Sequence, residues 1–300
     1  MDNVKRRLGK PKRIEGSVYH DPSGNSAWGY PAVFRSEEGW RLVYGINLEP
    51  SWDSGGGWVC LAYSSDGIEW RPDARAAKVE IPNRKAPNQI SAAGPAGIMS
   101  SAFVADPPVP GLERYNFLFH SHAGGTIWTS SDFLIWRKVE GISWQNPNPD
   151  PPTFVHYNAR RKRWVLSSRP DFCDRRIALF ETTDFRQYTP MELALHTDSM
   201  DRPLTQIYGM PIFEYDGWFI GLPWMFDCSP TETKSLPHKY RGGKQYPQLA
   251  YSLNGWHWQR SLREPFIPNG EPGEPDAGCL QPSCMVRLPD GSLRFYASTS

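Results

Sequence analysis

The chain has 300 residues, of which 39% are hydrophobic, and its 33 Lys and Arg against 32 Asp and Glu leave a net charge of +1. This length suffices for a large core in one domain or in two small ones. The balanced charge gives no electrostatic reason to expect nucleic acid or an anionic membrane as a partner, so we expect neither. The oligomeric state does not follow from composition.

The N-terminal stretch MDNVKRRLGKPKR is basic and lacks the apolar core of a signal peptide. We therefore expect a cytoplasmic protein, or a secreted one if a leader has been removed. The cysteines are odd in number, widely spaced and without a CxxC pair, which argues against a disulfide framework and a thiolate zinc site. They stand at positions 60, 173, 228, 279 and 284. We expect no metal and no cofactor.

Proline and glycine punctuate the whole chain, with 29 Pro and 26 Gly. Between them lie short runs rich in aromatic residues, which number 13 Trp, 13 Tyr and 14 Phe. Short aromatic and β-branched runs between turn residues are typical of strands. The sequence therefore predicts an all-β protein of many short strands.

Four segments share one layout, in which a hydroxyl residue precedes Asp or Asn and an aromatic residue follows three or four positions later. They are SSDGIEW (64–70), SSDFLIW (130–136), TTDFRQY (182–188) and SLNGWHW (252–258). Such a polar pair nucleates a tight turn through side-chain to backbone hydrogen bonds, and we expect the aromatic ring to pack beneath it. Upstream of each segment lie three strand-like runs, so we interpret the four stretches as internal repeats.

The repeats are spaced like the blades of a propeller. Their turn acids or amide stand at positions 66, 132, 184 and 254, intervals that fit four strands plus loops. We predict one domain, 1–300, forming a five-bladed β-propeller of four-stranded antiparallel blades. The blades span roughly 21–75, 95–140, 150–190, 205–260, and 276–300 plus 1–20. The last blade is either completed by the N-terminal segment, which we favour, or truncated.

Two acids occupy equivalent places in this scheme. Asp21-Pro22 precedes the inner strand of the first predicted blade, and Asp150-Pro151 precedes that of the third. Inner strands line the central channel, so the two carboxylates could face one another across it. Glycoside hydrolysis needs such a pair, roughly 5 to 9.5 Å apart. Asp-Pro is also a common turn opener, which is the alternative interpretation.

The motif HDPSGN (20–25) resembles the Asn-Asp-Pro-Asn-Gly opening of the invertases, and PDPPTFVHYN (149–158) looks like their Arg-Asp-Pro strand. The chain is thus similar to the five-bladed propeller glycosidases, which include arabinanases, xylosidases, invertases and levansucrases. Its layout is most similar to hydrolase-like members without an assigned activity. The resemblance implies that Asp21 is the base or nucleophile and that Asp150 stabilises the transition state.

The chain departs from the invertase pattern at two places. The stretch Tyr208-Gly209-Met210-Pro211 has no Glu where the invertases carry their acid, and residue 149 is Pro where they have Arg. The general acid must then come from elsewhere. Asp276, just before the fifth predicted inner strand, is the first candidate. Glu274 and Asp201 are the others.

Side chains near the predicted channel could contact a sugar. His120 and His122 share one strand face because side chains alternate with period two, and they could serve as proton donor or sugar ligand, or as hydrogen-bonded structural residues. Flat amphipathic rings stack on sugar faces. The candidate substrate-binding residues are Trp28, His120, His122, Tyr208, Trp224 and Gln281.

We therefore predict a glycoside hydrolase acting on a small or terminal carbohydrate, with an oligosaccharide or glycoside as its substrate. One alternative is a non-catalytic carbohydrate-binding or scaffold propeller that has lost an acid. Another is a sialidase-like enzyme, because SSDGIEW is similar to the Asp-box turn of that group. The chain is short for the six blades of a sialidase and has no evident arginine triad. Fold alone does not choose among these functions.

Overall fold

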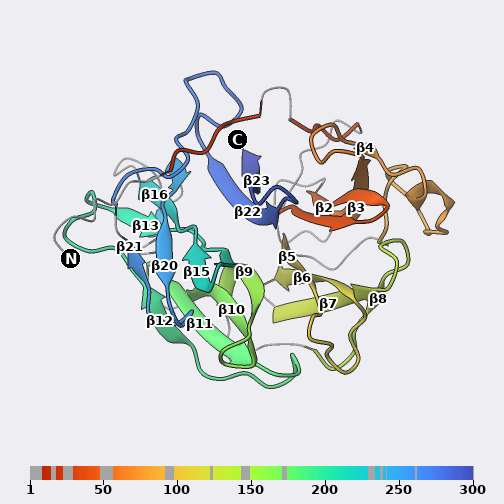
Figure 1. The fold of residues 1–300 in the computed structure, drawn as a ribbon, viewed down its shortest axis with the longest axis horizontal. Coiled ribbons are helices and arrows are strands. Elements are labelled where there is room, and N and C mark those ends of the chain that lie inside the picture. The colour runs from red at the N-terminus through yellow and green to blue at the C-terminus, as the bar shows by residue number, and fades with distance from the viewer. Residues whose placement is uncertain are drawn as a thin grey trace.

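The computed structural model is all-β (Figure 1). It describes the chain except for residues 1–8, 15–17, 23–29, 48–56, 92–97, 122–123, 143–148, 171–173, 229–233, 237–238, 241, 261 and 300. The helix found in the described residues is a short 3-10 turn, Ala76–Lys78. In these same residues, no helix has the length and hydropathy needed to cross a membrane.

Three four-stranded antiparallel sheets follow one another along the chain, each with its strands in sequence order. The first sheet consists of β1 (Ala32–Ser36), β2 (Gly39–Asn47), β3 (Gly57–Ser64) and β4 (Arg71–Pro72). The second consists of β5 (Ile98–Val104), β6 (Tyr115–Ser121), β7 (Gly124–Ser130) and β8 (Arg137–Lys138). The third consists of β9 (Pro149–Asn158), β10 (Arg163–Pro170), β11 (Ile177–Thr182) and β12 (Glu192–Leu195). Each sheet is a meander formed by one stretch of chain.

The fourth sheet is divided into two hydrogen-bonded halves. One half contains β13 (Thr205–Ile207), β16 (Trp224–Cys228) and β19 (Gly243–Pro247). The other contains β14 (Ile212–Tyr215), β15 (Trp218–Gly221), β20 (Ala250–Ser252) and β21 (Gln259–Arg260). Pro211 and Pro223 interrupt the ladder because proline has no N–H to donate. Backbone bonds still join the halves, with Leu222 N donating to Pro211 O and Gln248 N to Pro223 O. A short hairpin, β17 (Lys234–Leu236) and β18 (Lys239–Tyr240), lies between β16 and β19 in the chain.

The last sheet has two strands in the described residues, β22 (Leu280–Arg287) and β23 (Leu293–Thr299). It lies between the first and fourth sheets (Figure 1). Residues 9–14 and 18–20 form no strand, and residues 1–8 and 15–17 lie outside the described residues, so completion of the last blade by residues 1–20 stays a prediction. Pro11 withholds an N–H from any ladder in this stretch. Within the described chain, β23 therefore pairs with β22 alone.

Neighbouring sheets pack face to face around a common centre (Figure 1). Strand β1 shows the principle: Phe34 packs with Phe117 and Phe119 of the second sheet, whereas Val33 packs with Cys284 and other residues on the side of β22. Successive side chains of a strand point to opposite faces, so each sheet has a buried cluster on either side. The result is a β-propeller-like arrangement of radial sheets.

The four repeated turns have the geometry that the sequence predicts. In each, a side-chain oxygen of the acid or amide accepts hydrogen bonds from the backbone N–H groups two and three residues later. The residue after the acid or amide has a positive φ in all four: Gly67, Phe133, Phe185 and Gly255. The following aromatic residue seals the turn, since Trp136 donates to Phe133 O and Tyr188 to Phe185 O. The prediction of a turn-forming repeat is confirmed.

The turn carboxylate of the second sheet gives a stability prediction. Replacing Asp132 with Ala removes the acceptor for the N–H groups of Leu134 and Ile135, and we expect the free energy of unfolding to fall by about 1–2 kcal/mol. The control is Asp132→Asn, because Asn254 fills this role in the fourth sheet. The free energy of unfolding of Asp132→Asn should fall by less than half as much as that of Asp132→Ala. Urea unfolding curves of the three proteins measure the difference.

The same carboxylate makes the effect dependent on pH. Burial raises the pKa of Asp132, but hydrogen bonds from Ile135, Leu134 and Ser130 outweigh it and leave that pKa below its ordinary 3.8. A lowered pKa in the fold means that the stabilisation is present above the ordinary value and is lost as the pH falls through the lowered one. The difference between wild type and Asp132→Asn should shrink as the pH falls below about 4. A constant difference from pH 7 to pH 2 would contradict this account.

Candidate active site

An ion pair lies where β9 and β10 meet the centre of the molecule. Asp150 and Arg169 are cross-strand neighbours, and Arg169 Nη2 donates to Asp150 Oδ2 at 2.9 Å. The side chains are 13% and 4% exposed, respectively. Burial lowers the pKa of Arg169, but the charge of Asp150 and the contacts with Tyr208 and Tyr30 together outweigh it and leave that pKa above its usual value. The arginine beside Asp150 therefore comes from the adjacent strand, β10.

Tyr208 joins this pair to a second arginine. Its carbonyl accepts a hydrogen bond from Arg169 Nη1 at 2.7 Å, and its ring lies 4.4 Å from the Arg169 guanidinium carbon. The Arg175 guanidinium carbon lies 5.4 Å from the same ring, and Arg175 Nη1 donates to Gln206 Oε1 at 3.0 Å. We call Asp150, Arg169, Arg175, Gln206 and Tyr208 the mouth cluster. Neither arginine was predicted, because the cross-strand register that brings Arg169 to Asp150 is not readable from the sequence.

Aromatic rings form a floor beside the mouth cluster. Tyr30, Phe154 and Trp224 form one buried group, with Tyr208 packed against it. The Tyr30 and Trp224 ring centroids are 5.0 Å apart, and Trp224 Nε1 donates to Pro282 O. These residues come from the first, third, fourth and last sheets, so the floor marks the place where the sheets converge. Trp224 is fully buried, which leaves it no exposed face for a sugar.

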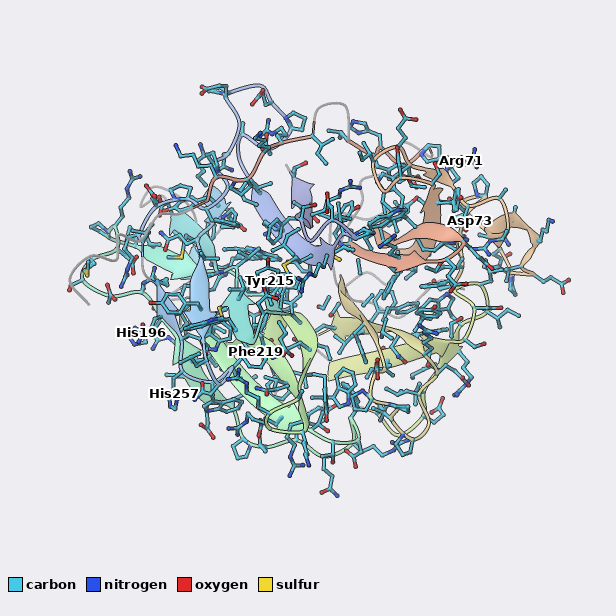
Figure 2. The ribbon with its side chains drawn as sticks, in the orientation of Figure 1. Arg71, Asp73, His196, Tyr215, Phe219 and His257 are labelled. Atoms are coloured by element: carbon cyan, nitrogen blue, oxygen red, sulfur yellow. The ribbon has the colours of Figure 1, made fainter. Side chains whose placement is uncertain are left out.

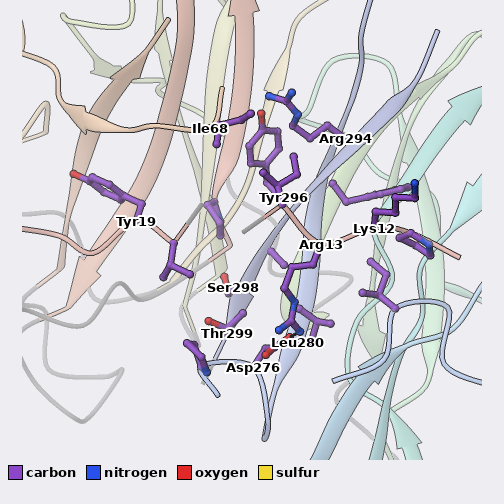
Figure 3. Close-up of a pocket in the computed structure, with 18 of the residues that line it drawn as sticks. Lys12, Arg13, Tyr19, Ile68, Asp276, Leu280, Arg294, Tyr296, Ser298 and Thr299 are labelled. Atoms are coloured by element: carbon purple, nitrogen blue, oxygen red, sulfur yellow. Dashed lines mark hydrogen bonds and ion pairs between the residues drawn. The ribbon is translucent and has the colours of Figure 1, made fainter. Parts of the chain in front are cut away.

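A cavity of about 1720 Å³ lies between the first sheet and β23 (Figure 3). Its lining includes Arg13, Tyr19, Asp21, Asp276 and Tyr296. The volume is above the roughly 300–1,000 Å³ of ordinary ligand pockets and gives room for several sugar units. Two of the three predicted catalytic acids, which are far apart in the chain, thus line one space.

Asp21 is buried on the first-sheet side of this cavity. Its Oδ2 accepts a hydrogen bond of 2.5 Å from the Tyr44 hydroxyl. The same hydroxyl contacts Tyr19 Oη at 2.9 Å and accepts from Asn88 Nδ2 at 2.8 Å. Burial raises the pKa of Tyr44 far above its ordinary value, so this phenol remains a proton donor to Asp21.

Asp276 also lines the cavity, where it is buried and forms an ion pair with Arg13 (Figure 3). Glu274, the second candidate acid, also pairs with Arg13 and is about half exposed. Asn269 Nδ2 donates to the Asp276 carbonyl and to the Gln245 carbonyl, which ties this loop to β19. These hydrogen bonds hold the backbone of the loop in place, and Glu274 and Asp276 of this loop line the cavity.

The cavity and the mouth cluster adjoin one another along the chain. Pro31 and Leu280 line the cavity, and the residues that precede them, Tyr30 and Cys279, lie close enough to interact electrostatically with one another. Asp150 and Arg169 act on Tyr30 in the same way. Gln281 continues this wall, since its Nε2 donates to Gln245 Oε1 at 2.6 Å. Asp21 and Asp276 thus line the cavity, and Asp150 of the mouth cluster is linked to it through Tyr30.

The other predicted site residues lie as follows. His120 is buried, with Nδ1 hydrogen-bonded to Thr153 Oγ1 at 3.1 Å, and Thr153 contacts Ser168 in turn. This is the arrangement of a structural histidine. Trp28 and His122 lie outside the described residues.

The third candidate acid, Asp201, is bound elsewhere. It forms ion pairs with Arg260 and Arg263. Arg260 also donates to the carbonyl of His196, which lies with His257 at the outer rim of the molecule (Figure 2). Asp201 thus belongs to a peripheral ion-pair network. Within the described chain, no group of three or more His, Cys, Asp or Glu side chains is placed to hold a metal ion.

Searches with the sequence find no matching protein-family model and no matching curated protein. Solved structures match in fold. An N-acetylgalactosamine deacetylase from F. plautii, in complex with blood group B trisaccharide, has a TM-score of 0.63 and 14% identity over 94% of this chain and 83% of its own. A putative glycoside hydrolase from Parabacteroides distasonis has a TM-score of 0.60 and 12% identity over 97% and 93% of the two chains.

A thermostable family-43 glycoside hydrolase matches with a TM-score of 0.57 and 12% identity, over 94% of this chain and 89% of its own. Sequence identities this low show a shared fold but not a shared activity. Any activity must be argued from the residues of this chain. The chain therefore shares the β-propeller fold of these glycoside hydrolases.

Proposed function

We propose that this chain is a glycoside hydrolase built on a five-bladed propeller, with β22 and β23 in the fifth blade. The observation that carries the proposal is that Asp21 and Asp276 line one cavity, while Asp150 acts electrostatically on Tyr30, which precedes the cavity residue Pro31. These residues come from the start, middle and end of the chain. Carboxylates that flank a sugar are what glycoside hydrolysis requires.

Asp150 suits the role of transition-state stabiliser. Its contact with Arg169 favours the ionised carboxylate, and an ionised carboxylate stabilises the positive charge that develops on the sugar ring. Arg169 also fixes the position of the carboxylate through its second hydrogen bond, to Tyr208 O. A preorganised charge of this kind costs no rearrangement during the reaction.

Asp21 and Asp276 are the proposed pair for proton transfer and attack. Both line the cavity, and each is held by a side chain, Asp21 by Tyr44 and Asp276 by Arg13. Arg13 contacts the Asp276 carboxylate, so it must move away before that carboxyl can reach a leaving group as general acid. Arg13 is half exposed, which makes such a movement inexpensive.

The likeness to solved glycoside hydrolases supports a carbohydrate substrate, and the cavity volume supports an oligosaccharide. The test is a screen of aryl glycosides and oligosaccharides with wild type and three variants, Asp21→Asn, Asp150→Asn and Asp276→Asn. Each variant should lower kcat/KM by about 10²–10⁴-fold. Asp132→Asn, which changes an acid in a remote turn, is the matched control and should leave kcat/KM unchanged.

The pH dependence of kcat/KM assigns the roles. Removal of the general acid should abolish the decline in rate at high pH, and removal of the base or nucleophile should abolish the decline at low pH. Because a deacetylase has the same fold, the screen also includes N-acetylated amino sugars with acetate release as the readout. Carbohydrate binding without turnover of any substrate would favour a non-catalytic binding propeller instead.

A further inference from the structure

Two guanidinium groups lie over one aromatic ring in the mouth cluster. Arg169 comes from the end of β10 and Arg175 from the residues before β11, and their guanidinium carbons lie 4.4 and 5.4 Å from the Tyr208 ring centroid. Arg175 also lies 5.4 Å from the Phe226 ring. Two like charges are thus held against the same aromatic surface, and the described negative charge that acts on both is the single carboxylate of Asp150.

The two arginines differ in their hydrogen bonding. Arg169 uses Nη1 for Tyr208 O and Nη2 for Asp150, while its Nε is buried without a hydrogen-bond acceptor in the described chain. Arg175 is partly exposed and donates to Gln206, a neutral amide. Burial and the charge of Arg169 lower the pKa of Arg175, which expresses the repulsion between the two groups.

Further basic residues gather at the same end of the fourth sheet. Asp227 is the cross-strand neighbour of Thr205 and Lys244, and it pairs with Arg202, which is 82% exposed. Arg202 and Lys244 thus add positive charge at this end of the fourth sheet, and positive charge attracts anions and repels cations.

We propose that the mouth cluster binds a carbohydrate carrying an oxyanion, seated between Arg169 and Arg175 against the Tyr208 ring. The inference rests on the proposed function and names its substrate class: a sugar with a uronate carboxylate or a sulfate ester. Guanidinium groups match the geometry of both oxyanions with paired N–H donors. The Tyr208 ring supplies the flat apolar surface that a sugar face needs.

The test measures binding, so that its result is separate from hydrolysis. Isothermal titration is performed with three matched disaccharides: one carrying a uronic acid, one carrying a sulfate ester, and the neutral parent. We expect at least one anionic disaccharide to bind about tenfold or more tightly than the neutral one, with affinity falling as salt rises. The anionic disaccharide that binds more tightly identifies the oxyanion, either the uronate or the sulfate ester.

Arg175→Gln removes the charge and keeps a hydrogen-bond donor. This variant should bind the preferred anionic disaccharide about tenfold more weakly than wild type and bind the neutral disaccharide with unchanged affinity. Arg175→Lys keeps the charge but lacks the planar guanidinium group, so its affinity for the anionic disaccharide should lie between those of wild type and Arg175→Gln. The matched control is Arg176→Gln, the next residue, whose side chain pairs with Asp174. Circular dichroism and thermal melts establish that each variant is folded.

The outcomes separate this inference from the proposed function. Equal binding of charged and neutral disaccharides, or no binding of either anionic one at millimolar concentration, would overturn the inference even if neutral glycosides are hydrolysed. Conversely, selective binding of an anionic sugar that depends on Arg175, with no turnover of any glycoside, would support the inference and contradict the proposed hydrolysis.

Discussion

Replacing Arg169 with Met is expected to lower the free energy of unfolding by about 3–5 kcal/mol. The change keeps most of the side-chain volume but removes the partner of Asp150 and the donor to Tyr208 O. A carboxylate that is 13% exposed would then lose its ion pair with Arg169. The penalty is the cost of an uncompensated buried charge, which exceeds the net value of the ion pair itself. Guanidinium chloride unfolding of the purified protein measures it.

A double-mutant cycle identifies the cause of that loss. Adding Asp150→Asn to Arg169→Met removes the orphaned charge, so the double variant should recover about half of the lost stability. The matched control is Arg137→Met, because Arg137 pairs with Glu113 at 3.4 Å while both side chains are about half exposed. That change should cost no more than about 1 kcal/mol. Additive effects of Asp150→Asn and Arg169→Met would show that the pair is not coupled.

The repeats could be predicted from the sequence because their signal is local. A hydroxyl residue, an acid or amide and an aromatic residue within seven positions specify a turn without reference to the rest of the chain. Phe133 and Phe185 occupy positions that glycine fills at Gly67 and Gly255, all with positive φ. The alternation along β1 likewise follows from local period-two patterning. Sheet order and the all-β class therefore came directly from short sequence windows.

The mouth cluster could not be predicted because it depends on register. Arg169 faces Asp150 only because β9 and β10 pair with a shift between Ser167 and Arg169. A slip of one residue would turn the arginine to the other face of the sheet. The partners of Asp21 and Asp276 were also missed, since Tyr44 and Arg13 reach them through packing between sheets. The Pro-containing turns in the sequence indicate the acids, but the sequence does not indicate the residues that contact them.

The fourth and last sheets show a second limit of prediction from the sequence. Pro211 and Pro223 are visible in the sequence, but a proline can end a strand or merely interrupt it. Backbone bonds around both prolines hold the two halves of the fourth sheet together. The N-terminal residues carry no strong strand pattern, so completion of the last blade was inferred from closure of a ring rather than from the residues themselves. The described residues lie along the cavity without pairing to β23.

Truncation of Trp224 to Ala is expected to cost about 3–5 kcal/mol, comparable to the loss of Arg169. Its ring is fully buried, with centroids 5.0 Å from Tyr30 and 5.2 Å from Phe154, and its Nε1 donates to Pro282 O. Because these contacts join the first, third, fourth and last sheets at the centre, a cavity there loosens all of them together. Urea unfolding followed by far-ultraviolet circular dichroism measures the loss.

Trp218 provides the matched control on the same sheet. It is 42% exposed and has an edge contact with Tyr251, so Trp218→Ala should cost no more than about 1 kcal/mol. Trp224→Phe keeps most of the apolar ring and loses the bond to Pro282 O, which should place its stability between those of Trp224→Ala and wild type. If Trp224→Ala and Trp218→Ala were equally destabilising, the centre would not be the point that holds the sheets together. A larger loss at Trp224 instead means that the floor beneath the mouth cluster is set by packing among the first, third, fourth and last sheets.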